Sequence, residues 1–140
     1  MKIVDNTKEV SEDIRQRAIV LVTRMALMTQ TEIKLRAPVG KVAGGNLRHT
    51  IRTQVLESAT DTKVTARVGS TTFYAPFVEF GTGEYHEFGQ GRQGGWSYKG
   101  PDGEWRFTRG NKPLRFFRNG FDALVKSGTL DRMIREFYKK

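Results

Sequence analysis

The chain has 140 residues, a length that fits one domain of ordinary size. With 37% hydrophobic and 28% charged residues it has the composition of a folding protein, and the absence of cysteine excludes disulfides, thiolate chemistry and cysteine-based zinc sites. The net charge of +9 makes nucleic acid or an acidic protein surface a plausible partner. The longest apolar run, Ala18 to Val22, is far below the roughly 18 residues of a membrane span, and the polar start lacks a signal core, so we expect a cytosolic product.

A long helix is predicted from about Thr7 to Arg36. Its apolar residues follow at spacings of four, three, four and three, which places them on one helical face; they are Ile14, Ala18, Leu21, Met25 and Met28. Asn6 can cap its start, and the residue before Pro38 is a natural end. Cations on its other faces predict a solvated basic surface or one that meets DNA or an acidic partner; they are Arg15, Arg17, Arg24, Lys34 and Arg36.

A loop and an antiparallel hairpin are predicted after this helix. Gly44 and Gly45 indicate a mobile loop, and Asn46 can cap a short turn of helix. In residues 51–58 and 63–70 the apolar period falls to two and β-branched residues become frequent, which is typical of strands. The polar segment "SATDTK" between them predicts the turn.

The stretch "FYAPFVEFGTG", residues 73–83, places four aromatic side chains around Glu79 and ends in glycines. It opens a loop over residues 81–95 with six glycines among fifteen residues. A second hairpin follows, with Pro-Asp-Gly as its turn. We expect four aromatic side chains on one face of this ribbon, covered by this chain's sheet or by a neighbouring subunit; they are Trp96, Tyr98, Trp105 and Phe107.

The segment from Leu114 to Lys140 predicts two consecutive helices or one kinked helix. Its apolar residues have nearly helical spacing, with a break at Gly128 and a new cap at Thr129. The whole pattern predicts a single α+β domain over residues 1–140. In this domain a long N-terminal helix and a C-terminal helix pack on a small antiparallel sheet, with a long loop and an aromatic hairpin.

Catalysis or metal binding would have to use Glu79 together with Glu84, His86 and Glu87. The "EYHE" segment lacks the second histidine of a zinc helix motif and lies among glycines, so a solvated loop is favoured. The Glu-x-Lys spacing at residues 32–34, known from some nucleases, falls inside a predicted helix, and His49 is better placed as a surface or interface residue. No phosphate-binding or dinucleotide-binding glycine motif is present. We therefore expect no enzyme, no metal and no cofactor.

A small basic nucleic-acid-binding module without catalysis is the alternative function. The basic helix and the segments "NLRHTIR", "GRQGGWSYKG" and "FRNG" combine cations with aromatic residues, as single-strand binding surfaces do. The sequence contains no recognition-helix motif, zinc finger or aromatic ribonucleoprotein signature. This alternative predicts tight, salt-dependent binding by the isolated monomer.

The order of these segments, from about residue 10 to 138, resembles the gene-product-ten-like family of tailed phages, the small head-to-tail joining proteins also described as neck or tail-completion proteins. The most specific part is "YAPFVEFGTG", similar to the family's Tyr-Ala-x-x-x-Glu-x-Gly-Thr pattern; the matching residues are Tyr74, Ala75, Glu79, Gly81 and Thr82. "NLRHTI" is similar to the family's Gly-x-Leu-Arg-x-Ser-Ile segment, with Thr50 in place of serine. After Pro113 the later prolines of the family are missing, and Gly120 stands where alanine is common.

The resemblance implies a structural virion protein of a phage or prophage, made in the host cytoplasm and assembled as a ring at the neck, without enzymatic activity. The implied partners are further copies of itself, a head-completion or portal-side protein, a tail-terminator or tail-tube protein, and passing DNA in transient contact. Tyr74, Phe77 and Phe80 would hold a turn on the core while Glu79 accepts hydrogen bonds from backbone or an arginine.

The oligomer interface is expected in the glycine-rich loop and the aromatic ribbon. Gly81 and Gly83 would turn the chain into a loop that orders only against a neighbour. The expected interface residues are Glu84, Tyr85, His86, Phe88, Arg92, Trp96, Tyr98, Trp105 and Phe107.

Overall fold

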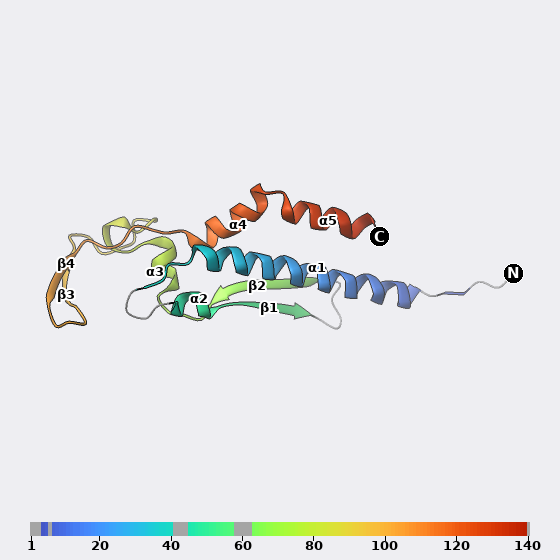
Figure 1. Cartoon of the computed structure of the whole chain (residues 1–140), viewed down its shortest axis with the longest axis horizontal. Helices are drawn as coiled ribbons and strands as arrows, with labels where there is room; N and C mark the ends of the chain where they lie inside the picture. The colour runs from blue at the N-terminus through green and yellow to red at the C-terminus, as the bar shows by residue number, and fades with distance from the viewer. Residues whose placement is uncertain (1–3, 6, 41–44, 58–62, 140) are drawn as a thin grey trace.

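The computed structural model describes residues 4–5, 7–40, 45–57 and 63–139 of the chain. Its elements in chain order are α1 (Thr7–Arg36), α2 (Asn46–Thr50), β1 (Ile51–Glu57), β2 (Val64–Ser70), α3 (Ala75–Phe80), the 3-10 turn η1 (Gly83–Tyr85), β3 (Trp96–Lys99), β4 (Trp105–Thr108), α4 (Phe116–Lys126) and α5 (Thr129–Lys139). The molecule is elongated, with a body of helices and one sheet and with the β3–β4 ribbon beyond its end (Figure 1). The predicted α+β class is confirmed.

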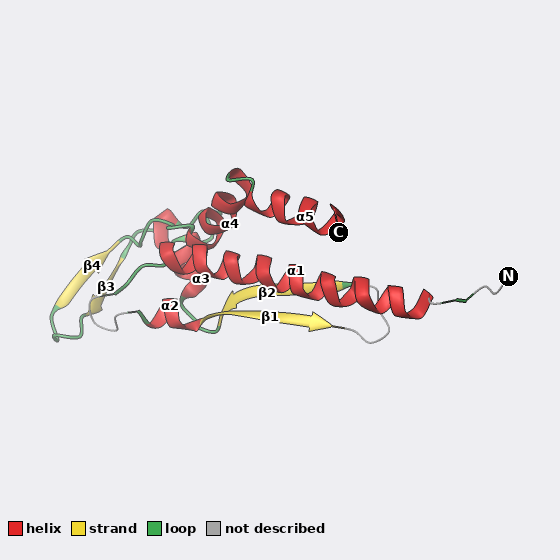
Figure 2. Cartoon of the chain, turned by 45° about the vertical axis from the view of Figure 1, so that its right-hand side comes forward, coloured by secondary structure: helices red, strands yellow, loops and turns green. Residues whose placement is uncertain are grey.

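The body has three layers, with α1 in the middle. The β1–β2 sheet lies against one side of α1, while α4 and α5 lie along the opposite side (Figures 1 and 2). The buried residues of α1 are Ala26 and Ile33, which lie outside the predicted apolar face. That predicted face is only partly covered, because Leu21 lines a hollow with Met133 and Phe137 of α5, and Met25 lines another with Phe121 of α4.

The first hairpin is antiparallel as predicted, with Ile51 opposite Ser70 and Glu57 opposite Val64. Ala66 and Val68 face α1, whereas Arg67 on the other face of the sheet is exposed. Alternation along the strands therefore separates an apolar inner face from a polar outer face. Residues 58–62 of the predicted turn, the loop glycine Gly44 and the cap Asn6 lie outside the described residues.

The core forms where the end of α1 meets α2, β1, α3 and α4. Its buried residues are Ile33, Ala37, Leu47, Ile51, Ala75 and Phe116, and Ile51 and Phe116 are the largest that are fully enclosed. Gly120 of α4 lies directly on α1, because a Cβ at this position would come within 2.9 Å of the Ile33 backbone nitrogen. The glycine therefore permits the two helices to cross closely.

The C-terminal segment forms two consecutive helices, which is the first of the two predicted alternatives. Gly128, with φ of 70°, separates α4 from α5, and its carbonyl accepts the backbone N–H of Arg132 at 3.0 Å. Thr129, predicted as the cap, is the first residue of α5.

The second hairpin also forms, but the expectation of four aromatics on one face is wrong. Its register places Trp96 opposite Thr108, and Lys99 opposite Trp105. Opposite residues share a face, so Trp96 and Tyr98 lie on one face while Trp105 and Phe107 lie on the other. The cause is the turn: Gly100 N–H donates to the Glu104 carbonyl at 2.8 Å, and this pairing fixes the register.

Candidate functional site

The motif around Glu79 forms a junction between α3 and α4. Glu79 is 7% exposed, and its carboxylate accepts backbone hydrogen bonds from Phe117 at 2.9 Å and Arg118 at 3.2 Å. These N–H groups belong to the first turn of α4, where no intrahelical acceptor exists. Glu79 therefore caps α4 from another helix, and the expected backbone hydrogen bonds to this residue are confirmed.

The chain just before α4 also pairs with α3. Leu114 N–H donates to the Val78 carbonyl at 2.9 Å, and Arg115 N–H donates to the Glu79 carbonyl at 3.2 Å. Arg115 has φ of 52°, a left-handed conformation that is uncommon outside glycine. This conformation turns the chain so that both the backbone and the first turn of α4 meet Glu79.

Glu87 adds a charged contact at the same junction. Its carboxylate accepts two hydrogen bonds from Arg118, at 2.7 and 3.0 Å, and lies 3.2 Å from the Arg115 guanidinium. The hydrogen bond from Arg118 is the main cause of the lowered pKa of Glu87. The backbone N–H of Glu87 donates to the Phe80 carbonyl at 2.9 Å, so the loop is fixed to α3 as well.

The glycine-rich loop is ordered by its own chain, so the expectation that it orders only against a neighbour is wrong. Thr82 N–H donates to the Asn111 carbonyl and Glu84 N–H to the Arg109 carbonyl, both at 2.9 Å. The Glu84 carboxylate accepts the Gly94 N–H at 3.1 Å and lies 3.5 Å from Arg109. These contacts join the loop to the segment that follows β4, and so fix the base of the ribbon.

The residues considered for catalysis or metal binding have separate structural partners. Glu79 caps α4, Glu84 pairs with Arg109, and Glu87 pairs with Arg118. The ring Nδ1 of His86 accepts the Phe88 N–H at 3.3 Å. Across the described ranges, no group of three His, Asp or Glu residues is placed to hold a metal ion. The geometry of these side chains is that of a structural junction.

The aromatic residues predicted for the interface fall into two groups. Trp96 is half-buried at the base of the ribbon, where the Arg92 guanidinium lies 5.7 Å from its ring centre. The exposed group contains Tyr85, Phe88, Tyr98, Trp105 and Phe107. Trp105 is the most exposed of these five, at 72%. Of the three aromatic residues expected to hold the turn on the core, Tyr74 packs against it, Phe77 is 53% exposed, and the half-buried Phe80 has its ring 5.6 Å from the ring of Phe88 in the loop.

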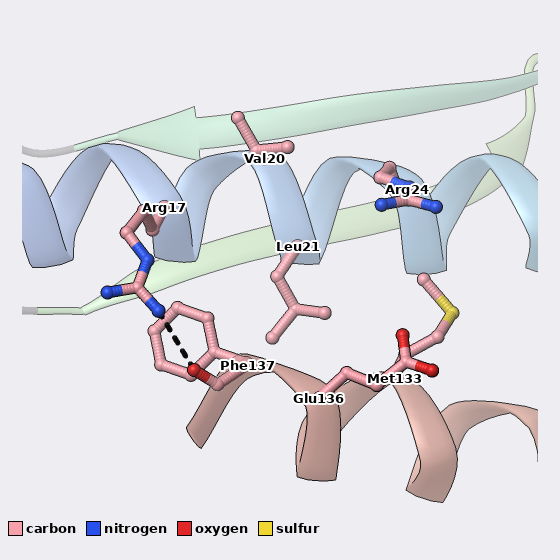
Figure 3. A pocket seen from close by; sticks show the side chains of 7 residues that line it. All are labelled: Arg17, Val20, Leu21, Arg24, Met133, Glu136 and Phe137. Carbon is pink, nitrogen blue, oxygen red and sulfur yellow. Dashed lines mark hydrogen bonds between the residues drawn. The ribbon is translucent and has the colours of Figure 1, made fainter. Parts of the chain in front are cut away.

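The cations of α1 do not form one basic surface. Arg17 and Arg24 face α5 across a hollow of about 220 Å³ that Leu21, Met133 and Phe137 also line (Figure 3). Arg17 donates to the Phe137 carbonyl at 2.9 Å, and its guanidinium lies 5.2 Å from the Phe137 ring centre. Arg36 pairs with Glu32 on its own helix. Several of these side chains thus stabilise the fold.

A second hollow lies beside α3 and was not predicted. It has a volume of about 530 Å³ and is lined by Pro38, Tyr74, Phe77, Val78, Thr82, Asn111, Lys112 and Leu114. Three segments far apart in the sequence contribute to it, so no local pattern could have indicated it. Leu114 in its wall is 52% exposed.

Residues 2–81 match the sequence model of the family described as "Bacteriophage HK97-gp10, putative tail-component". The chain belongs to this family. It is a bacteriophage tail component with a structural role in the virion, and the resemblance drawn from its motifs is confirmed. Comparisons with curated proteins and with solved structures returned no match.

The matched region of this tail component ends at Gly81. It includes Tyr74, Ala75 and Glu79 of the motif, while Thr82, the ribbon and both C-terminal helices lie beyond it. Glu79 therefore links the region that matches the family model to the rest of the chain. None of the described helices combines the length and the apolar character that crossing a membrane requires.

Proposed function

We propose that this tail component joins the phage head to the tail tube as a ring of copies at the neck. The observation that carries the proposal is the ribbon, which stands beyond the end of the elongated body (Figure 1) and exposes 72% of Trp105 and 62% of Phe107. Large aromatic side chains that are exposed to solvent indicate a surface that a partner covers. A subunit with such an arm is suited to contact several neighbours.

The partners in this proposal are neighbouring copies, a head-completion or portal-side protein, and a tail-terminator or tail-tube protein. A ring needs an interface in which each copy presents different surfaces to its two neighbours. The contacts at Thr82 and Glu84 fix the ribbon on the body, so the ribbon can transmit a defined orientation to the next subunit. The exposed Arg52 and Arg67 on the outer sheet face suit transient, sequence-independent contact with DNA phosphates.

Electron microscopy of phage particles tests this function. The wild-type gene is compared with a gene knockout and with the double variant Trp105→Ala, Phe107→Ala. We expect filled heads and finished tails that lie unjoined in both mutants, and a tagged copy of the chain at the neck of wild-type particles. Tyr138→Ala, which removes an aromatic 80% exposed on α5 and away from the ribbon, is the matched control and should give joined particles.

Two outcomes contradict the neck role. Joined particles from the knockout show that the chain is dispensable for joining. A tagged chain recovered on nucleic acid outside virions, with steeply salt-dependent binding, supports the basic nucleic-acid-binding module instead.

A further inference from the structure

The three-layer body has two open flanks, one on the side of β1 and the other on the side of β2. The sheet contains only these two strands, and among the described residues each pairs only with the other, so each strand has one free edge. We propose that the β1 flank of one copy pairs with the β2 flank of the next copy. This inference rests on the proposed ring and specifies the contact that would build it.

Both free edges are open to pairing with a further strand. The register between β1 and β2 is unbroken from Ile51 opposite Ser70 to Glu57 opposite Val64, so neither strand contains a bulge, and neither contains a proline. Bulges and prolines are among the devices with which proteins protect an edge strand from pairing. Without them, the outward N–H and C=O groups of each edge can form a regular ladder with another strand. The edges therefore suit an extended strand as their partner.

The β2 flank also contains an apolar hollow of about 480 Å³. Among the described residues β2 contributes to its lining and β1 does not, which places the hollow on the β2 side of α1. Phe121 in its wall is 50% exposed, so the hollow is open to solvent. The lining includes Val22 and Met25 of α1, Ala66 and Val68 of β2, Phe121 of α4 and Leu130 of α5.

The opposite side of α1 carries exposed apolar side chains. Val20 and Leu27 are 57% and 48% exposed, and their spacing of seven residues places them on one face of the helix. Thr29, which lines the hollow, follows two residues after Leu27 and therefore lies roughly 200° around the helix from it. Val20 and Leu27 thus belong to the β1 flank, next to the free edge of β1.

The two flanks match in direction, level and width, which identifies a second copy as the partner. Rotation about an axis along the strands keeps their direction, so β1 of one copy meets β2 of the next in the antiparallel sense. Leu27 lies at the same level of α1 as Met25 and Thr29 of the hollow, so the contact needs no shift along the axis and closes into a ring instead of a filament. Two strands span about 10 Å, and packed helices lie about 8–10 Å apart, so Val20 and Leu27 can enter the neighbour's hollow while the strands pair.

This contact places the outer face of the sheet inside the ring. The helices α1, α4 and α5 all lie on the other side of the sheet, and their greater bulk needs the larger outer circumference (Figures 1 and 2). The exposed Arg52 and Arg67 of the outer face then line a basic lumen that suits the phosphates of passing DNA. One interface thus accounts for both free edges, for the apolar hollow and for the exposed side chains of α1.

Thiol cross-linking in assembled particles tests the helical part of this contact, and the chain is suited to it because it contains no cysteine. Phage are prepared with Leu27→Cys and Phe121→Cys in the same gene, and purified particles are treated with a short bismaleimide and separated on a denaturing gel. The two positions lie on opposite flanks of one chain, so we expect a ladder of dimers, trimers and larger species.

Matched variants control this experiment. Each single variant should give no ladder, and Leu27→Cys with Phe107→Cys, which moves the second cysteine to the β3–β4 ribbon, should give at least tenfold less product than the pair across the flanks. Leu130→Cys in place of Phe121→Cys places the cysteine elsewhere in the same hollow and should restore the ladder if Phe121→Cys reduces the yield of particles.

Mixed particles test the strand pairing separately. A host that supplies two copies of the gene gives particles that contain a chain with Arg67→Cys and a chain with Arg52→Cys, Gln54→Cys or Leu56→Cys, three outer-face positions that cover the possible registers. After mild oxidation we expect disulfide-linked dimers from at least one of the three combinations, and nothing larger because each chain has one cysteine. Thr53→Cys, whose side chain is on the inner face of β1, is the control and should give no dimer with Arg67→Cys.

The outcomes separate this contact from the proposed function. Particles that carry the chain at the neck but give neither product overturn the pairing of the flanks and leave the neck role standing. Both products from particles in which the chain lies away from the neck support the pairing and overturn the neck role. A ladder without strand disulfides overturns the shared sheet, and cross-linking of Leu27→Cys to a different virion protein overturns the contact between copies.

Discussion

Glu79 and Phe117 are joined by a hydrogen bond of 2.9 Å between a buried carboxylate oxygen and a backbone N–H in the first turn of α4. Their positions in the sequence are 38 residues apart, and only Glu79 lies in the region matched by the family model. A negative charge at a helix N-terminus is favourable, because it meets the positive end of the helix dipole and free N–H donors. This contact joins the start of α4 to α3.

Replacing Glu79 tests how much this junction contributes to stability. Glu79→Ala leaves two N–H groups near the core without their acceptor, so we expect the free energy of unfolding to fall by about 2–4 kcal/mol. Glu79→Gln keeps one acceptor oxygen but turns an NH₂ group toward the second donor, so its loss should be smaller. Urea denaturation followed by circular dichroism measures both changes.

Glu104→Gln is the matched control, since Glu104 lies at the exposed tip of the ribbon. We expect this control to change the unfolding free energy by less than about 0.5 kcal/mol. An equally small effect of Glu79→Ala would show that the cap contributes little and that apolar packing alone positions α4.

The ion pair between Glu87 and Arg118 predicts a pH dependence of stability. The pKa of Glu87 is lowered from its ordinary value of 4.5, chiefly by the hydrogen bond from Arg118. Because the folded state holds the proton more weakly than the unfolded state, the contribution is fully present above about pH 4.5 and is lost as the pH falls through the folded-state pKa. We expect Glu87→Gln to lower the melting temperature near neutral pH, and the difference from wild type to shrink in acid.

Asp131→Asn provides the comparison for this pH series, because Asp131 pairs with Arg135 within one exposed turn of α5. Its effect on the melting temperature should be small at every pH. A constant gap between wild type and Glu87→Gln from neutral pH down to about pH 3 would contradict the assignment of the pH dependence to this carboxylate.

Local periodicity was sufficient to predict most elements of this fold. The bounds of α1 agree with the predicted Thr7 to Arg36, and both hairpins and the break at Gly128 lie where turn residues and spacing placed them. These features depend on neighbours a few residues away, which is the range over which helical and strand patterns operate. The family motif at Glu79 was also informative, because a buried carboxylate requires donors.

Features that depend on pairing between distant segments were not predicted correctly. Which side chains share a face of the second ribbon depends on a register that the hydrogen bond between Gly100 and Glu104 fixes. A shift of this register by one residue would move the side chains of one strand to the opposite face. The hollow beside α3 combines Pro38 with Leu114, and the loop is ordered by Asn111 from beyond the ribbon. Such contacts leave no periodic signal in the sequence.

Gly120 provides a test of the close contact between α4 and α1. In an exposed helix, replacing glycine with alanine would raise the free energy of unfolding by about 1 kcal/mol, because alanine has the higher helix propensity. Here a Cβ would lie 2.8 Å from the Ile33 side chain and 2.9 Å from its Cα, so α4 must move away from α1. We expect Gly120→Ala to lower the unfolding free energy by about 1–3 kcal/mol, as overpacking does.

Asn119→Ala is the control for this helix, because Asn119 is the exposed neighbour of Gly120 and its side chain makes one hydrogen bond of 3.3 Å to the Leu114 carbonyl. Its effect should stay below about 1 kcal/mol in either direction. If Gly120→Ala increased stability by the full propensity gain, the two helices would have to cross with more space than the Ile33 contact indicates.

The contact of Arg17 with α5 predicts how the C-terminal helix is held. The guanidinium donates to the Phe137 carbonyl at 2.9 Å, in the last turn of a helix that has no buried residue, and also lies over the Phe137 ring (Figure 3). A cation at a helix C-terminus and a cation–π contact are each worth about 0.5–1 kcal/mol. Arg17→Ala should therefore speed hydrogen exchange of the α5 amides by about 5–30-fold while the amides of β1 and β2 keep their rates.

Arg24→Ala is the control for this contact. Arg24 lines the same hollow but makes no hydrogen bond to the other residues labelled in Figure 3, so its removal should leave the α5 amides protected. If both variants speed exchange equally, general packing across the hollow holds α5, and the Arg17 hydrogen bond has no special part in it.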